Sequence, residues 1–150
     1  MKRIFSAALC FLLIGTLIVP VSALETNTVI YHQETDCGNG VTMVDEVIEH
    51  SQIRSSTKGY TRTKTIRYDG IIIGKIAVYG SFKYDGTTVS VITKRVNQAD
   101  TSEGWSYKQN SFTSSGGTIT LDAKLTKLLV MNIPFTITLS CDKDGNISYT

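Results

Sequence analysis

The sequence has few of the residues on which enzyme catalysis most often depends. Histidine occurs only at His32 and His50, and neither lies in a Gly-x-Ser-x-Gly or comparable nucleophile motif. A phosphate-binding loop and a dinucleotide fingerprint are also missing. No spacing of carboxylates indicates a glycosidase pair, although a pair distant in sequence stays open. We therefore predict a non-catalytic protein without a cofactor, with an unrecognised hydrolase as the alternative.

The chain has no C-terminal apolar span, wall-sorting motif or choline-binding repeat, but its N-terminus is apolar. Lys2 and Arg3 precede an apolar run over residues 4–19, and Val21-Ser22-Ala23 is a small-x-small cleavage pattern. This pattern predicts a signal peptide over residues 1–23. An uncleaved anchor is the alternative, but sixteen residues are slightly short for a bilayer span. We expect a secreted protein, free or associated with the cell wall, with no stable transmembrane span after cleavage.

Cysteine is scarce, and only Cys37 and Cys141 lie outside the predicted signal. Two thiols in an exported chain usually form a disulfide. This one would close a loop of about 100 residues, which is worth roughly 4–5 kcal/mol in the chain-entropy model. The alternative is zinc bound by both thiolates with His32 and His50, but the spacing fits no zinc motif. We predict a Cys37–Cys141 disulfide and no metal.

Net charge is absent from residues 24–150, because 13 Lys and Arg remain against 13 Asp and Glu once Lys2 and Arg3 are removed. The charge is nevertheless unevenly placed. Residues 24–50 carry six acids and no base, whereas residues 54–95 carry nine bases against Asp69 and Asp85. A neutral protein with a basic middle predicts a local anion-binding surface, and we expect no nucleic-acid partner.

Alternation of apolar and polar residues predicts β-strands. Residues 117–125 and 134–141 alternate strictly, as half-buried antiparallel strands do. Further strands are expected at 41–49, in the 59–84 region, after Gly86 and at 105–112, although 41–49 also fits a short helix. Residues 24–40 are expected to be irregular and pinned by Cys37. The pattern predicts an all-β fold, an antiparallel β-sandwich of about seven strands, immunoglobulin-like in general architecture, as a single domain over 41–150.

Two Tyr-Asp-Gly sequences predict two-residue hairpin turns at Asp69-Gly70 and Asp85-Gly86. The second turn would set Tyr84 opposite Thr87 in a consistent register. The first would set Lys64 opposite Lys75, a destabilising like-charge pair, unless a bulge at Gly74 shifts the register. The register of the 59–84 hairpin is therefore open.

The predicted registers place a set of basic side chains on one outward sheet face around a tyrosine. Such a face would attract a phosphate-bearing polymer of the cell envelope, such as teichoic acid. The alternative is a face neutralised by Asp45, Glu46 and Glu49, if strand 41–49 lies beside residues 62–67. The candidate anion-binding residues are Arg62, Lys64, Lys75, Tyr79, Lys83 and Lys94.

Residues 128–135, "LLVMNIPF", do not alternate. The interpretation we adopt is a hairpin end buried between the sheets. The alternative is an exposed apolar tip that contacts a membrane or a protein partner, as in a secreted bacteriocin-like effector. The candidate contact residues are Leu128, Leu129, Val130 and Met131.

Two weaker signals have simple structural interpretations. Residues 142–148, "DKDGNIS", resemble the opening of a calcium loop, but the early glycine and the missing closing glutamate favour a hairpin turn. Trp105 and Tyr107 could form a sugar-stacking platform, but a lone tryptophan in a sandwich is more often part of the core.

Three stretches carry a family resemblance: "VTMVDEVIEHSQIRSSTKGYTRTKTI", "EGWSYKQNSFTSSGGTITLDAKLTK" and "SCDKDGNIS". They resemble an uncharacterised family of small exported β-rich proteins from Gram-positive, often gut, bacteria. The resemblance covers most of residues 41–148 and implies export and a β-rich domain. Because the family has no assigned activity, the resemblance supplies no site residues.

Overall fold

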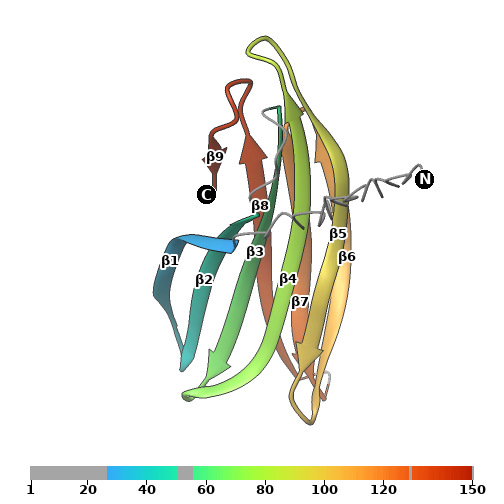
Figure 1. The fold of residues 1–150 in the computed structure, drawn as a ribbon. Coiled ribbons are helices and arrows are strands. Elements are labelled where there is room, and N and C mark those ends of the chain that lie inside the picture. The colour runs from blue at the N-terminus through green and yellow to red at the C-terminus, as the bar shows by residue number, and fades with distance from the viewer. Residues whose placement is uncertain (1–26, 51–55, 129, 150) are drawn as a thin grey trace, which may run out of the picture.

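Two antiparallel β-sheets pack face to face in the computed structural model (Figure 1). The structure describes residues 27–50, 56–128 and 130–149, and these contain no helix. The predicted signal peptide lies outside the described residues. The first sheet has the order β1-β2-β3-β4-β5, and the second has the order β6-β7-β8-β9. The strands are β1 (Asn27–Gly38), β2 (Val41–His50), β3 (Thr57–Tyr68), β4 (Ile71–Tyr84), β5 (Val89–Thr101), β6 (Trp105–Ser115), β7 (Thr118–Lys127), β8 (Met131–Cys141) and β9 (Ile147–Ser148).

The predicted all-β sandwich is confirmed, with nine strands instead of about seven. The core forms where the inward faces of the two sheets meet. The strands β7 and β8 alternate between buried and more exposed residues along their length, as a half-buried strand must. Each sheet is a meander of consecutive strands within the described residues. The likeness to the immunoglobulin fold is therefore in the two-layer architecture and not in Greek-key connectivity.

The expectation that residues 24–40 are irregular is wrong, because residues 27–38 form the strand β1. β1 pairs with β2 from Asn27 opposite His50 to Gly38 opposite Val41. Almost all of its side chains are exposed, so backbone hydrogen bonds to β2 hold it in place and side-chain burial contributes little. Because few of its side chains are buried, the sequence of β1 lacks the alternation of apolar and polar residues from which a strand can be predicted. Residues 41–50 form a strand and not the alternative helix.

The first predicted turn is confirmed, since Asp69 and Gly70 have positive φ angles of 49° and 79° and join Tyr68 to Ile71. A bulge beside Gly74 leaves Ile73 out of the register. Lys64 consequently faces Ile76 and not Lys75, which removes the like-charge pair.

The second predicted turn is wrong, because Tyr84 pairs with Val89 and the loop spans residues 85–88. The Asp85 carboxylate accepts hydrogen bonds from the backbone N–H groups of Thr87 and Thr88, at 2.9 and 2.7 Å. These bonds lower the pKa of Asp85. The aspartate therefore organises the loop with its side chain instead of occupying a left-handed backbone position.

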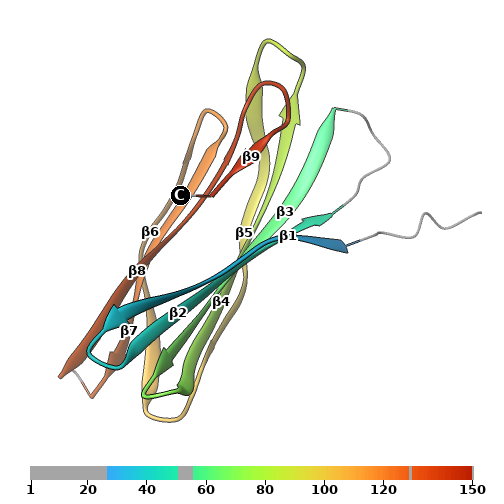
Figure 2. The ribbon, with the colours of Figure 1, turned by 90° about the vertical axis from the view of Figure 1, so that its left-hand side faces the viewer.

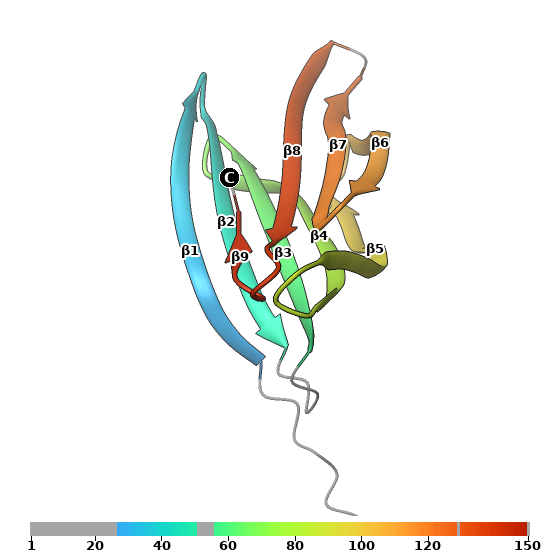
Figure 3. The same cartoon turned by 90° about the horizontal axis from the view of Figure 1, so that it is seen from above.

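The sheets differ in width, and this difference leaves one side of the sandwich open. β9 pairs with β8 only at Ser140 and Cys141, so the rest of β8 is an edge strand within the described residues. Figures 2 and 3 show β1 and β2 lying beyond β8, on the far side of β3. β9 lies over part of β2 in Figure 3, and Tyr149, which follows β9, packs on Tyr31 of β1 with ring centroids 4.2 Å apart. Among the described residues, the parts of β1 and β2 nearer their shared turn are therefore the ones left without a facing strand of the second sheet.

The β1–β2, β3–β4, β5–β6 and β7–β8 connections lie at the same end of the sandwich, the lower end in Figures 1 and 2. We call this the hairpin end. It consists of residues 38–40, 69–72, 102–104, 128 and 130.

Candidate binding site at the hairpin end

The hairpin end carries most of the exposed large apolar side chains that the structure describes. Ile71 and Ile72 are 68% and 52% exposed, and Leu128 and Val130 are 80% and 88% exposed. Only Val29 and Ile92 are similarly exposed elsewhere in the described residues. The predicted burial of the 128–131 tip between the sheets is thus wrong for Leu128 and Val130, whereas Met131 is half-buried. Leu129 lies outside the described residues.

Leu128 combines this exposure with a left-handed backbone, with φ at 49°. A left-handed conformation favours glycine, asparagine or aspartate over a residue with a bulky side chain. Solvent exposure also favours a polar residue at this position. Since neither backbone geometry nor folding explains a leucine here, the side chain is a candidate for contact outside the molecule.

Trp105 fills the space between the two apolar hairpins. The Trp105 ring centroid lies 6.2 Å from the ring centroid of Tyr68, on the β3–β4 hairpin. On the β7–β8 hairpin, the ammonium of Lys127 lies 5.7 Å from the Trp105 ring centroid. Trp105 is only 7% exposed, which confirms its assignment to the core. The hairpins that bear Ile71 and Leu128 are therefore held by a packed aromatic side chain.

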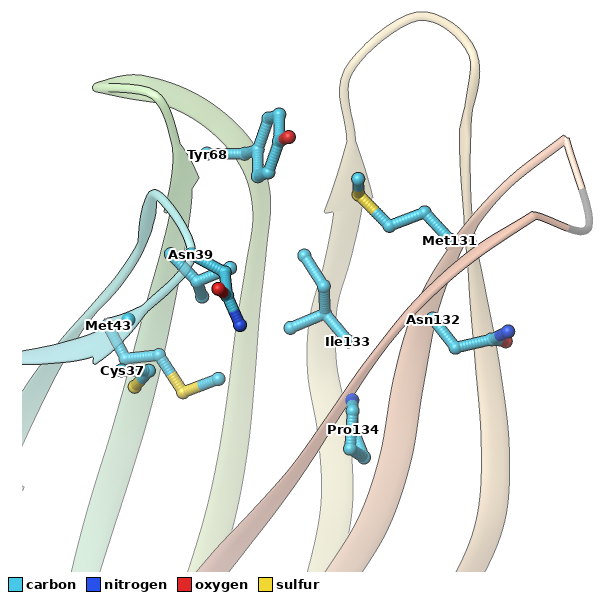
Figure 4. Close-up of a pocket in the computed structure, with 10 residues that line it drawn as sticks. Cys37, Asn39, Met43, Tyr68, Met131, Asn132, Ile133 and Pro134 are labelled. Carbon is cyan, nitrogen blue, oxygen red and sulfur yellow. The ribbon is translucent and has the colours of Figure 1, made fainter.

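A cavity of about 360 Å³ opens beside the same end, between the β1–β2 hairpin and the start of β8. In Figure 4, Met131 and Ile133 point from β8 toward Met43 and Tyr68, whereas Asn132 points away. The lining carries no ionisable acid or base other than the thiol of Cys37 and the phenol of Tyr68. It consists of Cys37, Gly38, Asn39, Val41, Met43, Tyr68, Met131, Asn132, Ile133 and Pro134.

A charged cluster lies further along the same open side. Asp45 on β2 binds Arg62 Nε at 3.0 Å and Lys64 Nζ at 3.2 Å. Arg62 Nη1 also donates to the carbonyl oxygen of Thr138 on β8, at 2.7 Å. The guanidinium therefore connects the first sheet to the unpaired edge of the second.

The predicted basic face is wrong, because its six residues do not share one face. Arg62 and Lys64 point inward, as the contacts with Thr138 and Asp45 require. The alternative in which β2 neutralises this region is confirmed for Asp45. Lys94 also points inward and donates to the Phe112 carbonyl at 3.0 Å.

The reversal at Lys94 has a local cause. A register shift at Ile92 places Val91 opposite Phe82 and Lys94 opposite Gly80, so two inward residues are separated by three positions instead of two. Lys75, Tyr79 and Lys83 keep the predicted outward orientation on β4. Arg95 joins them, with its guanidinium carbon 4.8 Å from the Tyr79 ring centroid.

The two histidines belong to the outward face of the first sheet. His50 lies 2.7 Å from both Asn27 Oδ1 and Thr61 Oγ1, through its two ring nitrogens. Asn27, His50 and Thr61 are thus hydrogen-bonded in the order of an orienting group, a base and a hydroxyl, as in hydrolase triads. These hydrogen bonds link side chains of β1, β2 and β3, and the cavity described above lies at the opposite end of the strands. His32 lies 3.7 Å from Glu46 and is exposed.

The predicted disulfide is wrong, since Cys37 and Cys141 are both free thiols. Cys37 lines the cavity on the side opposite Ile133, which lies on β8 (Figure 4). Cys141 lies eight residues further along β8, about 25 Å away at the rise of an extended strand. A disulfide needs Cα atoms within about 7 Å. The direction of β8 therefore separates the two cysteines that lie outside the predicted signal peptide.

The 142–148 segment forms the expected turn. Asp142 accepts hydrogen bonds from the backbone N–H groups of Asp144 and Asn146, at 2.9 and 2.8 Å, and from the Asn146 amide. The side-chain and backbone hydrogen bonds from Asn146 lower the pKa of Asp142. Among the described residues, no three His, Cys, Asp or Glu side chains converge in a way that could hold a metal ion.

No protein-family model, curated protein or solved structure matches this chain. Within the residues that the structure describes, no helix is long and apolar enough to cross a membrane.

Replacing Asp45 tests the charged cluster. We expect Asp45→Asn to lower the free energy of unfolding by about 3 kcal/mol, because it leaves two cations with side chains only 6% and 11% exposed without their carboxylate. Urea unfolding measures the change. Asp144→Asn, which removes an exposed pair with Lys143, is the matched control and should have no measurable effect. Equal losses in the two variants would contradict the role of Asp45.

Thiol labelling tests the correction of the disulfide. Cys37 is exposed, whereas burial raises the pKa of the Cys141 thiol to about 11. In native protein at pH 8, without a reductant, we expect a thiol reagent to modify Cys37 quickly and Cys141 only after unfolding. Peptide mass spectrometry assigns the sites. If neither thiol reacts until a reductant is added, the free-thiol state is refuted.

Proposed function

We propose that this protein is an exported, non-catalytic β-sandwich module that docks on a lipid membrane surface through its hairpin end. The observation that carries the proposal is the grouping of Ile71, Ile72, Leu128 and Val130 at one end. Exposed apolar side chains lower the solubility of a protein unless they are covered by a partner or a membrane. The hairpin turns project these side chains at an end and not along a face, which suits insertion to the depth of a few side chains.

Apolar burial is expected to supply most of the binding energy. Each Val, Leu or Ile side chain that becomes fully buried contributes about 1.5–3 kcal/mol. Lys127 lies beside Leu128, but Asp69 and Glu103 lie on the neighbouring turns, so the hairpin end has little surplus positive charge. Docking should therefore depend on the bilayer interior more than on anionic headgroups, and added salt should weaken it little.

Export and the lack of catalysis are parts of the same proposal. Export is supported by the signal-like pattern of residues 1–23 and by the resemblance of residues 41–148 to small exported proteins. A non-catalytic role is supported by the hydrogen bonds of His50, which are made to neighbouring strands at the end opposite the cavity.

Vesicle binding tests the docking. We expect Val130→Asp to reduce co-sedimentation with phosphatidylcholine vesicles by about tenfold or more, because a carboxylate replaces an apolar side chain at the inserted tip. Val29→Asp, at an exposed position about ten residues from the β1–β2 turn, is the matched control and should bind as the wild type does. Both variants keep the same N-terminal segment, so their difference reports on the hairpin end alone.

Equal binding of wild type and Val130→Asp would refute the proposal. Release of an entrapped dye from the same vesicles separates two forms of it. Leakage that Val130→Asp abolishes would indicate a bacteriocin-like effector, and binding without leakage would indicate a surface module.

A second candidate is binding of an anionic cell-envelope polymer to the outer face of β4. It is favoured by Lys75 and Lys83, which flank Tyr79 on that face, and by Arg95 above the tyrosine ring. These groups carry positive charge into solvent beside an aromatic surface, as a phosphate-bearing polymer requires.

Wall binding tests this second candidate. We expect Lys75→Gln combined with Lys83→Gln to weaken co-sedimentation with Gram-positive walls, and salt to weaken it further, because the attraction is electrostatic. Lys124→Gln combined with Lys127→Gln, on the second sheet, controls for net charge. Binding that is unchanged after removal of teichoic acid would contradict a polymer ligand.

A further inference from the structure

The cavity beside the hairpin end has a preformed wall. The backbone N–H of Asp69, on the β3–β4 turn, donates a hydrogen bond to the carbonyl oxygen of Gly40, on the β1–β2 turn, at 2.8 Å. Because a Cβ atom at Gly40 would collide with the Asp69 carboxylate, the two turns are in close contact. This contact holds Gly38 and Asn39, which line the cavity, in place beside Tyr68. A ligand therefore finds this wall already formed, as in most small-molecule sites.

Apolar side chains form most of the cavity away from the turns. The β2–β3 register sets Val41 opposite Tyr68 near the turns, and it places Met43 in the next inward position, about 7 Å further along β2. Met131 and Ile133 face these residues from β8 (Figure 4). The cavity volume of about 360 Å³ is in the range of small-molecule sites. This part of the lining suits an alkyl chain.

The polar groups that point into the cavity are uncharged. The Asn39 amide and the Tyr68 hydroxyl are directed toward β8 in Figure 4. Neither group has a hydrogen-bond partner within the part of the chain that the structure describes. Each can therefore donate a hydrogen bond to a ligand and accept one from it. Because the lining contains no Lys, Arg, His, Asp or Glu, a charged group in the cavity would lose water without gaining a counter-ion.

We propose that this cavity binds an uncharged single-chain lipid, with its hydroxylated head beside Tyr68 and Asn39 and its alkyl chain toward Met43. An apolar wall with two uncharged hydrogen-bonding groups and no ion selects an uncharged amphiphile. A membrane is the source of the ligand, because the cavity adjoins the docking tip and Met131 directly follows Val130. The choice of a membrane lipid rests on the docking proposed above.

Calorimetric titration of the full chain with alkan-1-ols, below their solubility limits and without vesicles, tests the cavity. We expect saturable binding that tightens by about fourfold per methylene from hexan-1-ol to octan-1-ol, as burial of alkyl surface requires. Octanoate should bind about tenfold more weakly than octan-1-ol, because its carboxylate finds no counter-ion. The fluorescence of Trp105, whose ring centroid lies 6.2 Å from that of Tyr68, gives a second signal for the same titration.

Two substitutions on β2 form a matched pair. Val41→Phe fills the cavity and should abolish octan-1-ol binding, whereas Val44→Phe, on the outward face of the same strand, should retain it. Tyr68→Phe keeps the ring and removes the hydroxyl, so it should weaken octan-1-ol binding by about fivefold. Thermal unfolding establishes that each variant is folded.

The inference is overturned if the folded wild type shows no saturable binding, if octanoate binds as tightly as octan-1-ol, or if Val41→Phe and Val44→Phe behave alike. An unchanged affinity in Tyr68→Phe would refute the position of the head. Val130→Asp should lose vesicle binding and keep octan-1-ol binding, and Val41→Phe should do the opposite. Octan-1-ol binding by a wild type that does not bind vesicles would refute the membrane as the source of the ligand. Failure of the cavity and failure of membrane docking therefore give different results.

Discussion

The unequal width of the two sheets determines the other main features of the molecule. A sandwich buries its inner faces completely only where both layers are present. Here β1 and β2 continue the first sheet past β8, and β9 covers only the last two residues of that edge. The open side must therefore satisfy the backbone groups of β8 and protect half-buried apolar residues on β2. The charged cluster binds one of these backbone carbonyls, and the apolar residues of β2 near the β1–β2 turn line the cavity.

Arg62 protects the edge of β8 from pairing with another chain. An unpaired edge strand invites association with strands of other molecules, and proteins block such edges with inward charges, prolines or bulges. The guanidinium of Arg62 binds the Thr138 carbonyl, and Pro134 has no backbone N–H to donate. Burying two cations requires a carboxylate nearby, which Asp45 supplies.

The hairpin end has the opposite character. Two of its four turns, β3–β4 and β7–β8, present aliphatic side chains to solvent, and Leu128 does so from a left-handed backbone. Trp105 packs beneath them, so the tips are projected from a rigid base.

Alternation in residues 117–125 and 134–141 was enough to predict two antiparallel strands and which of their residues face the core, because a half-buried strand has a period of two wherever it occurs. The Asp69-Gly70 turn was equally predictable, since it depends on local backbone preference. Bulges at Ile73 and Ile92 decided which face each lysine occupies, and they arise from pairing with distant strands. The sequence of residues 128–131 is compatible with both burial and exposure of their apolar side chains. The sequence positions of Cys37 and Cys141 likewise do not tell whether the two thiols are close in space. Only the tertiary structure decided these, because burial and distance depend on residues that are remote in the sequence and near in space.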